Sequence, residues 1–249
     1  MLLAIDIGNT TIAFGVFQGK KLKSSWKISA WSIFSKKALK LPGNMDAAII
    51  SSVVPKATST VKKMIAQKYN IRPLVLGENI KAPIKNLYRD QEQVGQDRLV
   101  NAVAAKELYG YPAIVVDFGT AITFDVISKK GEYLGGIIVP GIETSLNALS
   151  EKAALLPKIK LSLPKGLVGR DTAESMRSGI FHGFSSLCDG IVSKLKTKYG
   201  KQPVIATGGH CRLMARFSKS IDMIDPDLTL RGLRIIYSRS SSSRHRNGH

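Results

Sequence analysis

After Met1 the chain begins with Leu2-Leu-Ala-Ile-Asp6-Ile-Gly8-Asn9-Thr10-Thr11-Ile-Ala-Phe-Gly15-Val-Phe17, and it repeats the pattern of this segment further on. The second copy is Ala113-Ile-Val-Val-Asp117-Phe-Gly119-Thr120-Ala-Ile-Thr123-Phe-Asp125-Val-Ile127. In each copy a short apolar run ends in an aspartate, a glycine turn with a threonine follows, and a second, alternating run leads back. This pattern predicts a tight β-hairpin whose tip carries a carboxylate, backbone N–H groups and hydroxyls.

The groups at these hairpin tips suit a ligand that carries phosphate. Glycine allows a ligand to approach the backbone closely. Backbone amides and threonine hydroxyls can hold phosphate oxygens, and an aspartate can orient a cation or its water shell. Two such hairpins at the heads of two halves indicate a duplicated pair of domains that bind one nucleotide. Two ordinary hairpins are the alternative.

The composition is that of a soluble globular protein, with 249 residues, 44% hydrophobic and 22% charged. The two cysteines, Cys188 and Cys211, have no metal-site spacing, and reduced thiols in a cytoplasmic protein fit them best. No apolar run approaches the roughly 20 residues that span a bilayer. The net charge of +19 permits nucleic-acid binding, but the lysines are dispersed and not interleaved with aromatic residues. We therefore expect a basic surface that attracts anionic substrates and no specific nucleic-acid partner.

Periodicity along the chain predicts strands that alternate with helices, which is a mixed α/β fold. Strands are expected at 2–7, 11–17, 24–29, 46–54, 73–76, 113–118, 122–128, 132–139 and 203–206. Helices are expected at 32–40, 56–69, 97–109, 142–154, 171–199 and within 224–237. Gly110-Tyr-Pro112 breaks the pattern, so we place one domain at 1–111 and a second at 112–237. Residues 238–249 are rich in Ser and Arg and are expected to be disordered.

The order of motifs resembles a known family. Gly95-Gln96-Asp97-Arg98, Asp117-Phe-Gly-Thr120, Gly135-Gly136-Ile-Ile-Val-Pro140-Gly141 and Thr207-Gly208-Gly209 follow one another. Together with the paired hairpins, they resemble type III pantothenate kinases of the actin/Hsp70/sugar-kinase superfamily, from Met1 to about Tyr237. The resemblance implies two similar ribonuclease-H-like domains with mixed sheets flanked by helices. It also implies ATP-dependent phosphorylation of pantothenate, the first step of coenzyme A biosynthesis.

Residue by residue, the resemblance assigns Asp97 as the general base. It assigns Tyr88, Gly95, Gln96, Asp97, Arg98 and Thr172 to pantothenate. It assigns Asp6, Ile7, Gly8, Asn9, Thr10, Thr11, Ile12, Ala13 and Thr120 to ATP, which would arrive with Mg²⁺. Asp117 corresponds to the ligand of a monovalent cation, K⁺ or NH₄⁺.

Structural alternatives remain open for several of these residues. Asp97 can be a helix N-cap residue, and either Asp171 or Thr172 can cap the helix that follows them. Arg98 can be a surface arginine, and Tyr88 can be a loop tyrosine packed on the core. A carboxylate near the hydroxyl of an acceptor can take its proton late in phosphoryl transfer without a strongly raised pKa.

The segment 171–199 carries an apolar stripe that suits either a core helix or a subunit interface. The resemblance favours a homodimer, with Thr172 reaching an acceptor pocket that the partner helps to build. Two other functions stay open: another small-molecule kinase of the same superfamily, and a non-catalytic regulatory or transcription accessory protein. The presence of Asp6, Asp97 and Asp117 together argues against lost catalysis.

Overall fold

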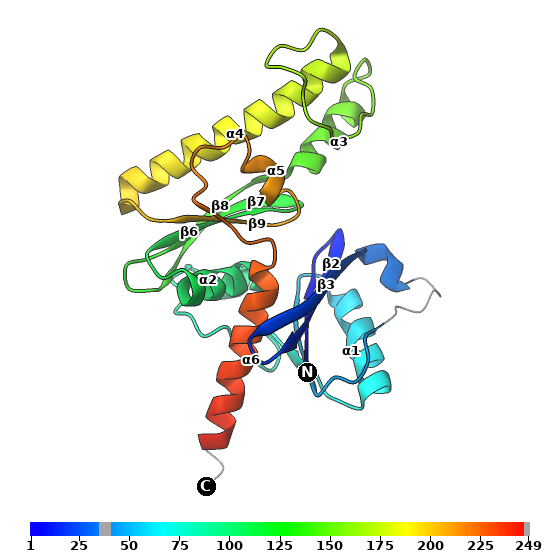
Figure 1. Cartoon of the computed structure of the whole chain (residues 1–249), viewed down its shortest axis with the longest axis vertical. Coiled ribbons are helices and arrows are strands. Elements are labelled where there is room, and N and C mark those ends of the chain that lie inside the picture. The colour runs from blue at the N-terminus through cyan, green and yellow to red at the C-terminus, as the bar shows by residue number, and fades with distance from the viewer. Residues whose placement is uncertain (35–40, 247–249) are drawn as a thin grey trace. The chain divides into compact units, whose positions relative to one another are not determined.

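The computed structural model describes residues 1–34 and 41–246, and it divides the chain into two compact units (Figure 1). Unit 1 comprises Met1–Gly110, Gly131–Tyr133 and Asp227–His249, and unit 2 comprises Tyr111–Lys130 and Leu134–Pro226. This division differs from the expected contiguous domains 1–111 and 112–237. The final segment of the chain groups with unit 1, because its helix packs on the sheet of that unit.

Unit 1 is built on a five-stranded sheet in the order β3-β2-β1-β4-β5. Its strands are β1 (Leu2–Ile7), β2 (Thr11–Gln18), β3 (Lys21–Ser29), β4 (Ala47–Ser52) and β5 (Leu74–Val75). Strand β2 is antiparallel to both β1 and β3, whereas β4 runs parallel to β1 and β5 runs parallel to β4. Two-residue alternation along β1 sends Leu3 and Ile5 to one face and Leu2 and Ala4 to the other.

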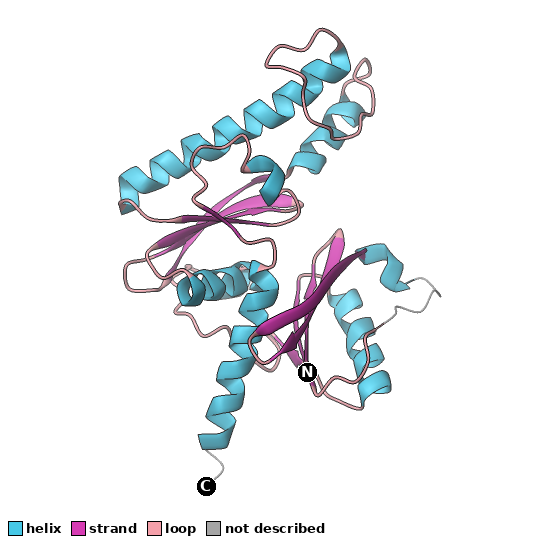
Figure 2. Cartoon of the chain, in the orientation of Figure 1, coloured by secondary structure: helices cyan, strands magenta, loops and turns pink. Residues whose placement is uncertain are grey.

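Helices cover both faces of this sheet (Figure 2). The 3-10 helix η1 (Ala30–Phe34) and α1 (Pro55–Tyr69) pack on the face of Leu3 and Ile5. The helices α2 (Gln96–Leu108) and α6 (Leu228–Arg246) pack on the opposite face. A short 3-10 turn, η2 (Gln91–Gln93), precedes α2.

Helix α6 extends further than the sequence predicted. It runs to Arg246, so the described part of the Ser/Arg segment is helical rather than disordered. Arg239 forms an ion pair with Glu107 at 2.6 Å, and the hydroxyls of Ser240 and Ser241 donate to the carbonyl of Tyr237. The first turns of α6 are held in the core, and these contacts stabilise the turns that follow. Composition alone does not reveal such contacts.

Unit 2 repeats the topology of unit 1, with the strand order β8-β7-β6-β9-β10. Its strands are β6 (Ala113–Phe118), β7 (Ala121–Ile127), β8 (Tyr133–Pro140), β9 (Val204–Thr207) and β10 (Met223–Ile224). The first residue of β8, Tyr133, groups with unit 1. Its helices are α3 (Ile142–Lys152), α4 (Thr172–Tyr199) and α5 (Cys211–Met214). Strand β7 is antiparallel to β6, and β9 is parallel to it, as β2 and β4 are to β1.

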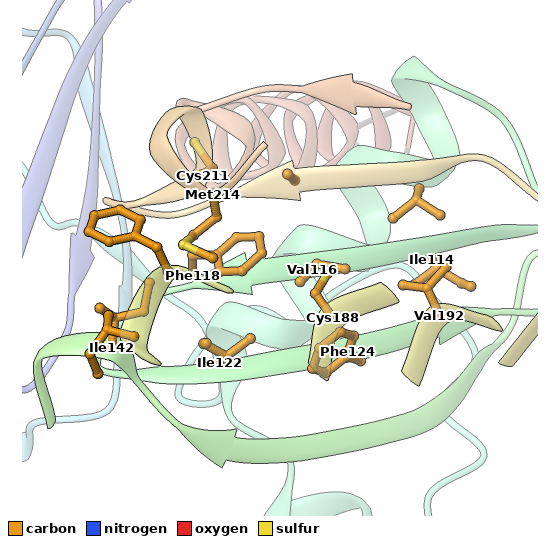
Figure 3. Packing of buried hydrophobic residues seen from close by; sticks show 14 of the residues in the cluster. Ile114, Val116, Phe118, Ile122, Phe124, Ile142, Cys188, Val192, Cys211 and Met214 are labelled. Atoms are coloured by element: carbon orange, nitrogen blue, oxygen red, sulfur yellow. The ribbon is translucent and has the colours of Figure 1, made fainter. Parts of the chain in front are cut away.

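The core of unit 2 joins the sheet to its helices, as Figure 3 shows. Val116 and Phe124 from the strands meet Cys188 and Val192 of α4 and Met214 of α5. Cys188 and Cys211 are both buried and form no disulfide. The apolar stripe of α4 therefore faces the core of its own unit over much of its length.

The predicted duplicated α/β architecture with mixed sheets is confirmed. Helix α5 and strand β10 were not expected from the sequence, because they are too short to show a period. The expected helix 32–40 is a 3-10 helix up to Phe34, and residues 35–40 lie outside the described residues. Within the described part of the chain, no helix is long and apolar enough to cross a membrane.

Candidate functional site

The first predicted phosphate hairpin joins β1 to β2. Ile7 pairs with Ile12 at its base, and both side chains are buried in the core. The N–H of Gly8 donates to the carbonyl oxygen of Thr11 at 3.0 Å and closes the turn. The side chains of Asn9, Thr10 and Thr11 are exposed at the tip. Ile7 and Ile12 can therefore meet a ligand only through their backbone, whereas the tip offers amide and hydroxyl groups.

Asp97 lies in the first turn of α2. The N-cap residue of this helix is Gly95, so Asp97 is not the N-cap residue. Oδ1 of Asp97 accepts the N–H of Arg98 at 2.9 Å. Burial raises the pKa of Asp97 above its usual value of 3.8, and the N–H and the positive charge of Arg98 oppose that rise. The result is a partly buried carboxylate that binds a proton more tightly than an ordinary aspartate.

The start of α2 lies at the carboxyl end of β4. A Cβ built on Gly95 would lie 3.9 Å from Cγ1 of Val53, the residue after β4. One built on Gly77 would lie 3.4 Å from the side chain of Gln96. Because β1 and β4 are parallel, the hairpin tip and the start of α2 belong to the same edge of the sheet. Ligands bind at this edge in open α/β sheets.

Tyr133 connects two residues that the sequence analysis proposed separately. Its ring centroid lies 6.5 Å from that of Tyr88 and 5.9 Å from the guanidinium carbon of Arg98. Tyr133 is fully buried and Arg98 is 6% exposed, so Arg98 is not a surface arginine. Sequence reasoning missed Tyr133, because a tyrosine at the start of a strand is an ordinary core residue.

The second hairpin places Asp117 near the end of β6. A Cβ built on Gly208 would press on Oδ1 of Asp117 and would lie 2.7 Å from backbone atoms of Phe118. The φ of Gly208 is +91°, a backbone conformation that also favours glycine. A Cβ on Gly119 would lie 3.4 Å from the same Oδ1. Gly208 and Gly119 therefore allow the backbone to pass close to this carboxylate. Carboxylate and carbonyl oxygens together are the hard donors that an alkali cation needs.

Thr120 is held by the start of α3. Its carbonyl oxygen accepts the N–H of Gly141 at 3.1 Å and the hydroxyl of Thr144 at 2.8 Å.

His210 was not proposed from the sequence. Its backbone N–H donates to the carbonyl oxygen of Phe118, and its ring Nε2 lies 3.4 Å from Oε1 of Glu143. Among the described residues, no three His, Cys, Asp or Glu side chains gather as a metal cluster.

Thr172 lines a cavity of about 920 Å³ between α3 and α4. The lining is mainly apolar and includes Thr144, Met176, Gly179 and Phe184. Asp171 caps α4 by accepting the N–H of Glu174 at 2.7 Å, so the capping residue is Asp171 and not Thr172. Thr144 contacts both this cavity and the Thr120 carbonyl, which joins the cavity to the second hairpin.

The predicted residues thus form two groups. Unit 1 holds the first hairpin, Tyr88 and the segment 95–98, and unit 2 holds Asp117, Thr120 and Thr172. In unit 1, the hairpin and the start of α2 share a sheet edge. In unit 2, the hairpin and the cavity share Thr144.

The chain matches a known protein family over most of its length. Residues 2–194 match the family model described as type III pantothenate kinase. The type III pantothenate kinase of Halalkalibacterium halodurans is 42% identical over 96% of this chain and 100% of its own length. That of Moorella thermoacetica is 42% identical over 97% of this chain and 100% of its own length.

Solved structures agree on the fold. A Campylobacter jejuni protein described as a Baf family transcriptional activator superposes with a TM-score of 0.62 at 22% identity, covering 96% of this chain and 99% of its own. Component A of the Acidaminococcus fermentans (R)-2-hydroxyglutaryl-CoA dehydratase gives 0.53 at 12% identity, covering 96% and 98%. At these identities the likeness establishes the shared fold alone.

Proposed function

Because the chain belongs to the type III pantothenate kinase family, we propose that it transfers the γ-phosphoryl group of ATP to the primary hydroxyl of pantothenate. This reaction is the first step of coenzyme A biosynthesis. The observation that carries the proposal is the partly buried carboxylate of Asp97, with a raised pKa, at the same sheet edge as the first hairpin. An acceptor alcohol and a nucleotide phosphate would have to meet at such an edge.

Asp97 would orient the hydroxyl of pantothenate and accept its proton. In a loose transition state, the hydroxyl loses its proton only as the new O–P bond forms, so a carboxylate suffices as base. The raised pKa brings the proton affinity of Asp97 closer to that needed at neutral pH. Gly95 leaves room for the carboxylate, and the Arg98 N–H fixes its orientation.

Arg98 would recognise the carboxylate of pantothenate. A guanidinium offers paired N–H donors that match a carboxylate. Tyr133 packs beside both Arg98 and Tyr88 and would hold them in a fixed arrangement. We assign Gly95, Gln96 and Thr172 to the same acceptor site by their match to the family motif.

The two hairpins would bind ATP. The tip at Gly8–Thr11 and the turn at Thr120 supply amide and hydroxyl groups for phosphate oxygens. Magnesium would arrive mainly on the ATP phosphates, with Asp6 ordering its waters. Asp117 with nearby backbone carbonyls suits a monovalent cation, K⁺ or NH₄⁺, which would supply positive charge next to the bound phosphates.

We further propose a cytoplasmic homodimer. The cavity between α3 and α4 is apolar, and neighbouring Leu155, Leu167 and Val168 are exposed. A two-fold dimer that covers this surface would make both acceptor sites equivalent and bring Thr172 to the pocket. Cys188 and Cys211 are buried and form no disulfide, which fits a reducing compartment.

The test is a coupled ADP-release assay with the purified full chain, ATP, Mg²⁺ and pantothenate, in potassium and in sodium buffers. Pantothenate-dependent ADP release supports the proposal, and mass spectrometry should find 4'-phosphopantothenate. ADP release that a sugar supports and pantothenate does not would favour another kinase of the superfamily. Absence of turnover with every acceptor would contradict the assignment.

The second candidate is a regulatory protein on the same fold. The net charge of +19 is the observation that favours it. It would require selective DNA binding, which is testable separately from turnover.

A further inference from the structure

The side chain of Ser51 is buried in unit 1 without a hydrogen-bond partner. Ser51 is 0% exposed, and among the described residues none pairs with its Oγ atom. Leaving a buried hydroxyl unpaired is unfavourable, so such groups call for an explanation. A serine that only filled space in a core would be replaced by alanine without loss.

The strand register places Ser51 beside Asp6. Ser51 of β4 is the Cα partner of Asp6 of β1 in a parallel pair, so their side chains leave the same face of the sheet. That face is covered by α2, because Ile49, two residues earlier on β4, packs in one cluster with Val100 and Val103.

The direction of α2 fixes what lies above Ser51. Gly95 lies near Val53 and the Val100 turn lies in the cluster of Ile49, so α2 runs back along β4 from its carboxyl end. The first turn of α2, which contains Asp97, therefore lies over the part of β4 that contains Ser51. The hydroxyl thus lies between the aspartate of the first hairpin and the turn that carries Asp97.

Unit 2 repeats this arrangement. Asp117 of β6 has Thr207 of β9 as its Cα partner in a parallel pair, and Thr207 is 1% exposed. In both units, a buried hydroxyl residue therefore stands next to the hairpin aspartate on the parallel neighbouring strand. The recurrence in two segments of different sequence indicates that the position serves the hairpin aspartate rather than local packing.

We propose that Ser51 is a positioning residue for the first hairpin, whose hydroxyl donates a hydrogen bond to the Asp6 carboxylate when nucleotide phosphates and Mg²⁺ bind. The proposal rests on the kinase function proposed above. Hydrogen bonds of this kind tighten on formation of the substrate complex and orient the groups that touch the ligand. Ser51 would act through Asp6 and not touch the reacting atoms.

The test compares Ser51→Ala with Ser52→Ala as a matched control. Ser52 accepts the N–H of Val54 at 3.0 Å and the hydroxyl of Thr58 at 2.7 Å, so its hydroxyl serves the start of α1. Calorimetry measures binding of a non-hydrolysable ATP analogue across a Mg²⁺ titration, and kcat and thermal stability are measured in parallel. Ser51→Ala should lower kcat about tenfold, the scale of one hydrogen bond to a charged group. It should also raise the Mg²⁺ concentration for half-maximal analogue binding several-fold, without lowering Tm.

Ser52→Ala should lower Tm and leave the Mg²⁺ dependence unchanged. Ser51→Thr, which copies the residue of unit 2, should retain the wild-type Mg²⁺ dependence. Wild-type Mg²⁺ dependence in Ser51→Ala would overturn the proposal, whatever its Tm. If the wild-type chain binds the analogue but does not phosphorylate pantothenate, the proposed function fails while the Mg²⁺ titration still decides the role of Ser51.

Discussion

Gly95 provides the space that the carboxylate of Asp97 occupies. A Cβ built on Gly95 would overlap Oδ1 of Asp97, although the backbone at Gly95, with φ of −54°, is open to any residue. Gly95 therefore leaves room for the Asp97 carboxylate in its present position, whereas the backbone conformation of Gly95 itself does not call for glycine.

Gly95→Ala is expected to displace the Asp97 carboxylate while leaving the fold intact. We expect kcat to fall by about tenfold or more, because a small misplacement of a reacting group is costly. Steady-state kinetics and circular dichroism would measure both effects. Gly190→Ala is the control, since a Cβ there meets nothing within 4 Å and should slightly stabilise α4. Equal kcat in the two variants would refute the steric argument.

Asp97→Asn should lower kcat by about 10²-fold or more, the scale of a positioned base, while nucleotide binding persists. A protonated Asp97 cannot accept the hydroxyl proton. For the wild type, kcat/KM should therefore fall on acidification with a midpoint above 3.8, since burial raises the pKa of this carboxyl. Near-normal turnover of a folded Asp97→Asn protein would exclude the role.

The same raised pKa makes a prediction for stability. The folded chain holds the Asp97 proton more tightly than the unfolded chain, so this group stabilises the fold below pH 3.8. That contribution is lost as pH rises through the raised pKa, and the ionised form is disfavoured at neutral pH. Asp97→Asn should therefore unfold at the same temperature as the wild type, or higher, at pH 7. A clear loss of thermal stability at pH 7 would contradict the conclusion that ionised Asp97 destabilises the fold.

The cation site predicts dependence on K⁺ or NH₄⁺ and poor activity in Na⁺. Asp117→Ala should abolish this dependence together with the activity. Gly208→Ala should weaken the cation dependence, because its Cβ would press on the Asp117 carboxylate. Rates measured at constant ionic strength in the three chlorides test this, and equal rates in sodium and potassium would remove the cation role.

The cavity between α3 and α4 predicts a dimer of about twice the chain mass of 27.1 kDa. Gly179→Arg should favour the monomer and lower activity without unfolding the chain, because Gly179 lines the cavity and a Cβ there meets nothing within 4 Å. Sedimentation at micromolar concentration measures the mass. A fully active wild-type monomer would show that the acceptor pocket closes within one chain.

The basic surface predicts weak, sequence-independent DNA binding that falls steeply with salt. Fluorescence anisotropy with unrelated duplexes at several salt concentrations would measure it. Sub-micromolar, sequence-selective binding at physiological salt would instead support the regulatory candidate.

The duplicated α/β fold can be predicted from the sequence, because hydrophobic alternation and glycine turns around Asp6 and Asp117 are local properties of the chain. The sequence also singled out Asp97 and Arg98 through the order of motifs. Three features are visible in the folded chain alone: α6 belongs with unit 1, Tyr133 packs beside Arg98, and Ser51 lies beside Asp6. These facts depend on strand register and on helix packing between segments far apart in the chain, which no local period encodes.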